Sequence, residues 1–437
     1  MTASGAIWQN WARTEKVRPK RVERPTSVGA VQRAVVAAAK AGLSIKAVGA
    51  GHSFTGIALA PGVQLDLHEL TGVIAVDAAS ARVTLAAGTH LYQLPDLLAP
   101  FGLALENMGD IDRQSVAGAT STGTHGTGGA FGGLATQIVA VTLVTGDGSL
   151  LRVSETENAE LLPAARLGLG ALGIIVELTF QCVPTYLLHA VEAAEPLEGV
   201  IENFVERSNA VDHFEFYWFP HTESALTKTN TRLPMEAPRN PLPKVGRWVD
   251  DELLANGFYR GTCALGTAVP ALVPRFSRLA EKLSGRREFT DLSHRVFVTN
   301  RTVRFREMEY AVPLEAVPAA LREVKSLIER KGWNISFPIE VRSAAADDNW
   351  LSTAQGWPSG YIAAHRYIQE NPAEYFGAVE EIMRGYEGRP HWGKMNYQDA
   401  ESLRAVYPHF DDFLAVRDRL DPERLFTNPY LKRVLGT

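Results

Sequence analysis

The sequence has few cysteines, no long apolar run and no excess of basic residues. Cys182 and Cys263 are its two cysteines, which excludes a disulfide framework and a zinc site with CxxC spacing. It contains no run of about 18 apolar residues, and its first residues lack the apolar core of a secretory signal. A net charge of -5 indicates no excess of positive charge of the kind that binds nucleic acid. We therefore expect a cytoplasmic protein that neither spans a membrane nor binds nucleic acid.

Two common nucleotide-binding fingerprints are also missing. No GxxxxGKS or GxxxxGKT motif occurs, which excludes a P-loop. In Gly49-Ala50-Gly51-His52-Ser53-Phe54, a phenylalanine stands where a Rossmann fingerprint has its third glycine, and no helical pattern follows. At 437 residues the chain is long enough for two domains or more. Any nucleotide must be held by another kind of loop.

Glycine, by contrast, is concentrated in two segments. Residues 107–129 read NMGDIDRQSVAGATSTGTHGTGG, and residues 49–53 follow a short strand pattern. Stretches with so few bulky side chains can bring bare backbone N–H groups against a polyanionic or planar ligand. We interpret the two segments as a cradle for a dinucleotide. Taken singly, each is explained equally well by a structural loop with an exposed histidine, His52 or His125.

The hydrophobic pattern predicts mixed α and β structure rather than a strict βαβ repeat. After Pro184 the composition changes, with aromatic residues at 213–220 and chain breakers at 233–245, so we expect a second domain there. The C-terminal segment around 421–430 is too short for a domain and should pack on an earlier part. Predicted helices cover 28–41, 91–99 and 314–331; predicted strands cover 44–48, 63–67, 73–76, 82–86, 138–145, 150–153, 173–183, 302–306 and 336–343, with a hairpin turn at 146–148.

Three charged residues are candidates for chemistry. Glu340 and Arg342 stand two apart on a strand pattern, so their side chains share one face, which either lines a site or meets solvent. Lys394 ends the sequence His391-Trp392-Gly393-Lys394, which combines two cations and an indole. That segment either caps a loop or contributes to a site.

Five segments together carry a family resemblance: GAGHSFTGIA (49–58), GDIDRQSVAGATSTGTHGTG (109–128), FPIEVRSAAADDNWLS (337–352), RPHWGK (389–394) and LDPERLFTNPY (420–430). In this order, and nearly from end to end, they resemble the aldonolactone oxidoreductases of the vanillyl-alcohol-oxidase flavoprotein superfamily. The bacterial L-gulono-1,4-lactone dehydrogenases and oxidases are most similar. D-arabinono-lactone oxidases and alditol oxidases are more distant.

The resemblance implies an α+β fold. Residues 1–187 would form an FAD-binding domain of two subdomains, residues 188–395 an α+β substrate (cap) domain, and residues 396–437 a segment returning to the FAD-binding domain. It implies FAD as cofactor, often bonded covalently in this family through the histidine that matches His52, and no metal. The residues expected to hold FAD are Gly49, Ala50, Gly51, His52, Ser53, Ser115, Gly118, Ala119, Thr122, Gly123, Thr124, His125, Gly126, Ile175 and His391.

The resemblance also implies oxidation of a sugar-1,4-lactone, L-gulono-1,4-lactone or a close stereoisomer, at its C2 hydroxyl to an ascorbate-type product. Arg342 would favour an alkoxide-like transition state, Glu340 would orient or accept the proton, and Lys394 would bind substrate or offset charge on the reduced flavin. The general base stays open among the three, with Glu340 our assignment. The alternatives are a xylitol-type alditol oxidase, a flavin carrier without turnover and an oxidase of phenols. Oxygen or an external acceptor would reoxidise the flavin, with access set by the small residues 116–119, and we favour the external acceptor.

Overall fold

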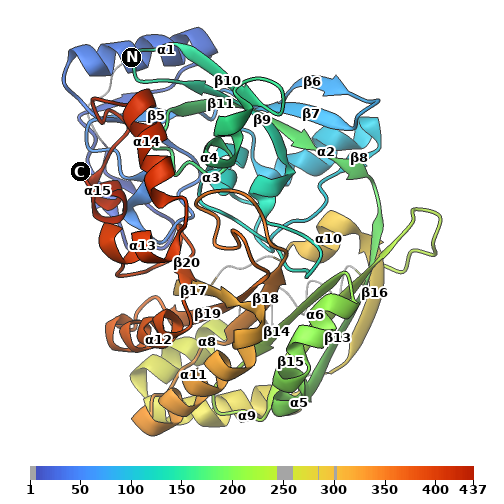
Figure 1. The fold of residues 1–437 in the computed structure, drawn as a ribbon. Coiled ribbons are helices and arrows are strands. Elements are labelled where there is room, and N and C mark those ends of the chain that lie inside the picture. The colour runs from blue at the N-terminus through green and yellow to red at the C-terminus, as the bar shows by residue number, and fades with distance from the viewer. Residues whose placement is uncertain (1–5, 244–258, 284, 300–302) are drawn as a thin grey trace.

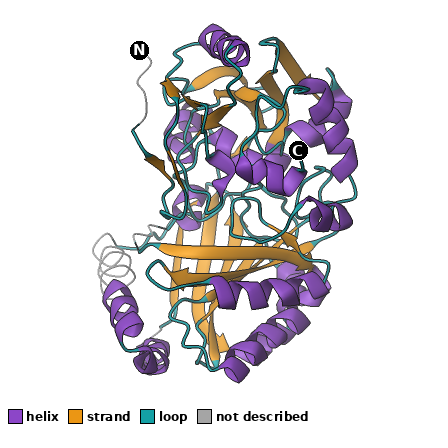
Figure 2. Ribbon diagram, turned by 90° about the vertical axis from the view of Figure 1, so that its left-hand side faces the viewer, coloured by secondary structure: helices purple, strands orange, loops and turns teal. Residues whose placement is uncertain are grey.

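The computed structural model describes residues 6–243, 259–283, 285–299 and 303–437. In Figures 1 and 2 the N-terminal strands lie above a larger sheet, which has helices packed beneath it. No helix of the described residues is both long and apolar enough to cross a membrane. The short strands β1 (Trp8–Gln9) and β2 (Lys16–Val17), and β8 (Leu103–Ala104) and β12 (Val183–Pro184), form two small antiparallel pairs.

The first glycine segment follows a small parallel sheet. Its strands, in the order β3, β5, β4, are Arg21–Glu23, Val63–Asp66 and Ile45–Val48. Helix α1 (Val28–Lys40) confirms the predicted helix, and its Ser27 cap accepts a hydrogen bond from the Ala30 N–H. Apolar side chains of α1 and of this sheet share one core.

A five-stranded antiparallel sheet supports the second glycine segment. The hairpin between its first two strands closes at Gly148, whose N–H donates to the Thr145 carbonyl at 2.9 Å, as the sequence predicts. The predicted helix 91–99 is divided into short pieces around Pro95 and Pro100. The sheet order is β10 (Leu150–Ser154), β9 (Ile138–Val144), β11 (Ile174–Gln181), β7 (Arg82–Ala86) and β6 (Val73–Asp77), and the nearby helices are α2 (Leu94–Leu98), α3 (Val116–Ser121) and α4 (Leu162–Ala165).

An eight-stranded antiparallel sheet forms the rest of the framework. The predicted strand 302–306 lies partly outside the described residues, and the strand observed there begins at Phe305. The breaker-rich loop at 233–245 likewise ends outside them. The sheet order is β16 (Arg287–Leu292), β13 (Leu187–Pro196), β15 (Ser224–Leu233), β14 (His213–Trp218), β18 (Ile339–Ala344), β19 (Ser359–Tyr367), β17 (Phe305–Pro313) and β20 (Arg389–Pro390).

The two faces of this sheet differ in chemistry, because successive strand residues point to opposite sides. On one face Phe216, Val341 and Ile362 belong to an apolar core shared with helices. The alternate positions on the same strands carry charged and polar residues, which leaves the opposite face polar. The helices of that core are α5 (Leu197–Glu202), α6 (Phe204–Ala210), α11 (Val317–Lys331) and α12 (Ala373–Gly385). Three other helices contribute no described residue to it: α8 (Tyr259–Ala268), α9 (Val273–Leu283) and α10 (Ser293–Phe297).

The C-terminal helices pack against the N-terminal strands (Figure 1). They are α13 (Ala400–Val406), α14 (Phe410–Leu420) and α15 (Pro429–Leu435). The Ile45 N–H donates to the Leu425 carbonyl at 2.9 Å, and Phe413 and Leu431 are fully buried in the core that includes Ile45. The last segment of the chain therefore supports the strand that leads into the first glycine segment. The domain boundaries at 187 and 395 stay a prediction.

Candidate functional site

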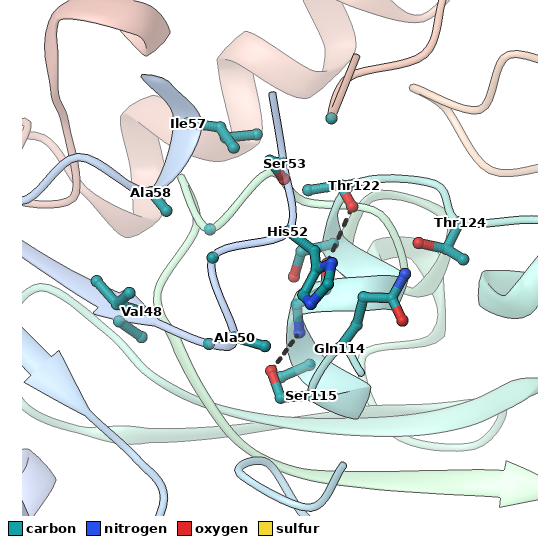
Figure 3. Close-up of a pocket in the computed structure, with 18 of the residues that line it drawn as sticks. Val48, Ala50, His52, Ser53, Ile57, Ala58, Gln114, Ser115, Thr122 and Thr124 are labelled. Atoms are coloured by element: carbon teal, nitrogen blue, oxygen red, sulfur yellow. Dashed lines mark hydrogen bonds between the residues drawn. The ribbon is translucent and has the colours of Figure 1, made fainter. Parts of the chain in front are cut away.

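A cavity of about 280 Å³ lies between the glycine segments and the polar face of the large sheet. Figure 3 shows Ala50, His52 and Ser53 from the first glycine segment facing Ser115, Thr122 and Thr124 from the second. Arg342 on β18 and Lys394 line the same cavity. Segments far apart in the sequence are thus brought to one site.

The residues 49–53 bring a run of backbone N–H groups to the cavity wall. All five line the cavity, and none of their N–H groups donates a hydrogen bond to any part of the chain that the structure describes. Gly51 has a φ of +69°, which favours glycine. Successive free N–H groups in a turn are suited to bind phosphate oxygens. We call this set, Gly49 to Ser53, the amide cradle.

The second glycine segment lies directly against the amide cradle. Ser115 caps α3 by accepting a hydrogen bond from the Gly118 N–H at 3.3 Å. A Cβ on Gly49 would lie 2.4 Å from the Ser115 Oγ, so the two segments meet closely because residue 49 is glycine. Gln114 also lines the cavity, and its Oε1 is buried without a hydrogen-bond partner within the described ranges. An unpaired buried polar atom of this kind fits a polar ligand.

His52 lies at the cavity wall with its ring stacked on Trp11, at 5.6 Å between ring centroids. Burial, together with the positive charges of Lys394 and Arg113, lowers the pKa of the His52 imidazole to about 4. The ring is therefore neutral at pH 7 and keeps a free nitrogen lone pair.

Arg342 is the centre of a buried charge network on the polar face. It forms an ion pair with Glu340, and its guanidinium lies 3.2 Å from Asp110 and 3.1 Å from Glu215. Burial alone would lower the pKa of Arg342, but Glu340, Asp110 and Glu215 raise it well above its usual value. The Tyr217 hydroxyl donates to Glu340 at 2.9 Å. Arg342 lines the cavity, whereas Glu340 is not among the lining residues.

Lys394 belongs to a second network, which is anchored on β17. Its ammonium forms an ion pair with Glu307, and the His125 imidazole lies 3.2 Å from Glu309, two residues further along the strand. Burial would lower the pKa of Lys394, but Glu307 and Glu309 raise it. Burial would raise the pKa of Glu307, but Lys394 and His365 hold it well below its usual range. Lys394 is therefore charged at neutral pH.

Most of the predicted site residues line this cavity. Ala119 is instead buried in the core, and Gly123 takes a turn with a φ of +79°. Gly126 packs closely on backbone, since a Cβ there would lie 2.3 Å from the Met108 carbonyl oxygen. Glu340 is in contact with Arg342 as described above. Those that do line the cavity are Gly49, Ala50, Gly51, His52, Ser53, Ser115, Gly118, Thr122, Thr124, His125, Ile175, Arg342, His391 and Lys394.

Several residues of the site were not predicted from the sequence. Glu307 and Glu309 stand two apart on a strand, the same signal that identified Glu340 and Arg342, but the predicted strand ended at residue 306. Glu215 and Tyr217 show this alternation within the aromatic cluster at 213–220. Gln114 and Asp110 had no pattern that distinguished them from the rest of their loop.

Comparison with known proteins identifies the family. Residues 19–154 match an FAD binding domain, and residues 178–434 match the D-arabinono-1,4-lactone oxidase family. The chain belongs to the D-arabinono-1,4-lactone oxidase family. It is an FAD-dependent oxidoreductase, as the resemblance implied. The amide cradle fits the anionic pyrophosphate of FAD, whereas the buried Gln114 oxygen, which is an acceptor, fits an N–H or O–H group of that cofactor.

Relatives match this D-arabinono-1,4-lactone oxidase family member over nearly its whole length. The L-gulono-1,4-lactone dehydrogenase of Mycobacterium tuberculosis is 45% identical over 98% of this chain and 99% of that protein. The L-gulonolactone oxidase of Bos taurus is 35% identical over 98% of each. The crystal structure of cholesterol oxidase from B. sterolicum covers 100% of this chain and 97% of that one with a TM-score of 0.83 at 17% identity, a likeness of fold alone. The predicted α+β fold with an FAD-binding domain of the vanillyl-alcohol-oxidase type is confirmed.

Proposed function

We propose that this protein oxidises the C2 hydroxyl of a sugar-1,4-lactone, L-gulono-1,4-lactone or a close stereoisomer, to an ascorbate-type product. The observation that carries the proposal is that two paired cations, Arg342 and Lys394, line one cavity together with the amide cradle. The names of the relatives support a lactone as substrate. No feature of the site favours the xylitol-type alternative.

Bound FAD supplies a hydride acceptor for the carbon that carries the hydroxyl. The amide cradle would hold the pyrophosphate of FAD, because its free N–H groups complement negative charge. His52 would hold the flavin covalently, and its neutral imidazole, which keeps a free nitrogen lone pair, supports this role.

Arg342 would stabilise the negative charge that develops on the substrate's hydroxyl oxygen in the transition state. Its raised pKa makes it a poor proton acceptor, so its part is electrostatic. Glu340 pairs with Arg342 and does not line the cavity, which supports an orienting role rather than the general-base role that we assigned from the sequence. Lys394 would bind substrate oxygens or balance charge on the reduced flavin.

An anaerobic assay of flavin bleaching tests the substrate class. We expect L-gulono-1,4-lactone, or its L-galactono or D-arabinono counterpart, to bleach the flavin, while xylitol leaves it oxidised. Bleaching by xylitol and by none of the lactones would replace the proposal with an alditol oxidase.

We propose that an external electron acceptor, rather than oxygen, reoxidises the reduced flavin. The same assay repeated in air tests this: hydrogen peroxide formed in step with lactone consumption would identify an oxidase instead. The cytoplasmic location and the lack of a nucleic-acid partner rest on composition.

A further inference from the structure

The chain that follows the amide cradle is held by one side chain from the C-terminal segment. Asn428 precedes α15 and is 2% exposed. Its Nδ2 donates to the carbonyl oxygens of Gly56, Ile57 and Leu59 at 3.0, 2.9 and 2.9 Å. We call residues 49–59 the cofactor loop. One buried amide thus donates hydrogen bonds to three carbonyl groups at the end of this loop.

The same side chain also caps α15. Its Oδ1 accepts a hydrogen bond from the Leu431 N–H at 2.9 Å. Serine, aspartate and asparagine cap helices about equally well. Aspartate, however, has no donor when ionised, and serine has a single short one. Capping alone would therefore be satisfied by any of the three, whereas the contacts to the cofactor loop require the amide.

The cofactor loop is joined at the same place to the segment that carries Lys394. The Phe54 N–H donates to the Gly393 carbonyl at 2.6 Å, and the Thr55 hydroxyl donates to the Trp392 carbonyl at 3.1 Å. The Tyr430 hydroxyl, two residues after Asn428, donates to that same Trp392 carbonyl at 3.0 Å. The start of α15 therefore contacts both the loop and the segment on which the site depends.

We propose that Asn428 is a positioning residue for FAD: it holds the cofactor loop so that the amide cradle and His52 face the cavity. Retention of FAD then depends on docking of the C-terminal segment, although Asn428 itself does not line the cavity. The inference rests on the proposed function in one respect, namely that the amide cradle binds FAD. It does not depend on which lactone is the substrate.

The test measures FAD affinity and folding separately in the full-length protein. Asn428→Asp has nearly the same shape and keeps the helix cap, but it loses the donated hydrogen bonds; Asn428→Ser does so without adding a buried charge. To make FAD exchangeable, both are built on His52→Ala and titrated with FAD. We expect each to weaken FAD binding about tenfold or more, as the loss of a buried hydrogen-bond network implies.

Ser27→Ala is the control for a general loss of stability, because it removes the side-chain cap of α1, and Ser27 has no hydrogen bond to the cofactor loop. It should lower the Tm of the apoprotein while leaving FAD affinity unchanged. Unchanged FAD affinity in both Asn428 variants, or an equal loss in Ser27→Ala, would overturn the proposal. A parent protein that takes up no FAD would overturn it together with the role of the amide cradle. A parent that binds FAD but oxidises no lactone would overturn the substrate alone.

Discussion

Protonation at the site is decided by the neighbours of each residue. Arg342 and Lys394 keep their charge because carboxylates raise their pKa values against the effect of burial. For His391 the effect of burial is larger than that of its neighbours: burial lowers the pKa of the imidazole to about 3, although Glu309 acts to raise it. The cavity therefore offers fixed positive charge from Arg342 and Lys394, and neutral imidazoles from His52 and His391, throughout the neutral pH range.

Removing the Arg342 guanidinium should slow the chemical step more than it weakens binding. We expect Arg342→Ala to reduce the rate of flavin reduction by the lactone roughly 10²–10³-fold, the loss typical of one preorganised electrostatic donor. Stopped-flow reduction under anaerobic conditions measures this rate. Arg322→Ala is the control, since Arg322 is an exposed residue of α11 in a surface ion pair with Glu198 at 3.1 Å. Equal rates in the two variants would remove Arg342 from the mechanism.

Glu340→Gln separates an orienting role from acid–base catalysis. The amide keeps an oxygen that can accept from the Tyr217 hydroxyl but loses the charge that holds Arg342. We expect a smaller loss in flavin reduction than for Arg342→Ala. A general base at this position would cost roughly 10²–10⁴-fold, so a loss larger than that of Arg342→Ala, with a changed pH profile, would restore Glu340 as the base.

At the scale of elements, local patterns were predicted from the sequence and long-range pairing was not. The alternation at Glu340 and Arg342 indicated a shared strand face correctly, because it depends only on neighbouring residues. The pairing of β14 with β18 joins segments more than a hundred positions apart, and no local pattern specifies that partner. Glu307 was missed for a different reason. The ends of predicted strands are uncertain by a few residues, and the strand predicted here ended at residue 306, so the alternation of Glu307 with Glu309 was not recognised.

The contact between the two glycine segments gives a test at this scale. In Gly49→Ala the added Cβ would lie 2.4 Å from the Ser115 Oγ, so the Ser115 cap of α3 or the amide cradle must shift. We expect FAD affinity to fall about tenfold or more, because the N–H groups of both segments lose their alignment. Gly199→Ala, on α5 with no atom within 4 Å of the new Cβ, is the control and should bind FAD normally. Normal binding by both variants would show that the cradle tolerates this shift.

At the scale of the whole molecule, the cavity wall is built from three parts of the chain. His52 comes from the N-terminal part, Arg342 from the large sheet, and Lys394 from the segment that leads to the C-terminal helices. Few local signals bring such segments together, which is why the order of family motifs along the whole sequence was more informative than any single motif. A ligand that contacts all three parts should also link them energetically.

That link predicts that FAD stabilises the folded protein as a whole. In the wild type we expect the flavin to remain with the polypeptide after acid precipitation, whereas His52→Ala should release it and still fold, because His52 is at the cavity wall rather than in the core.

FAD added to His52→Ala at about 100 times its dissociation constant should then stabilise the protein by roughly 2.7 kcal/mol, since a ligand that binds only the folded state shifts unfolding by mass action. Thermal unfolding followed by tryptophan fluorescence measures the shift, with FMN as the control ligand that lacks the adenosine half. A single transition that moves upward with FAD would show that the three parts unfold together. Two transitions, of which only one responds, would mean that the cofactor is held by one part alone.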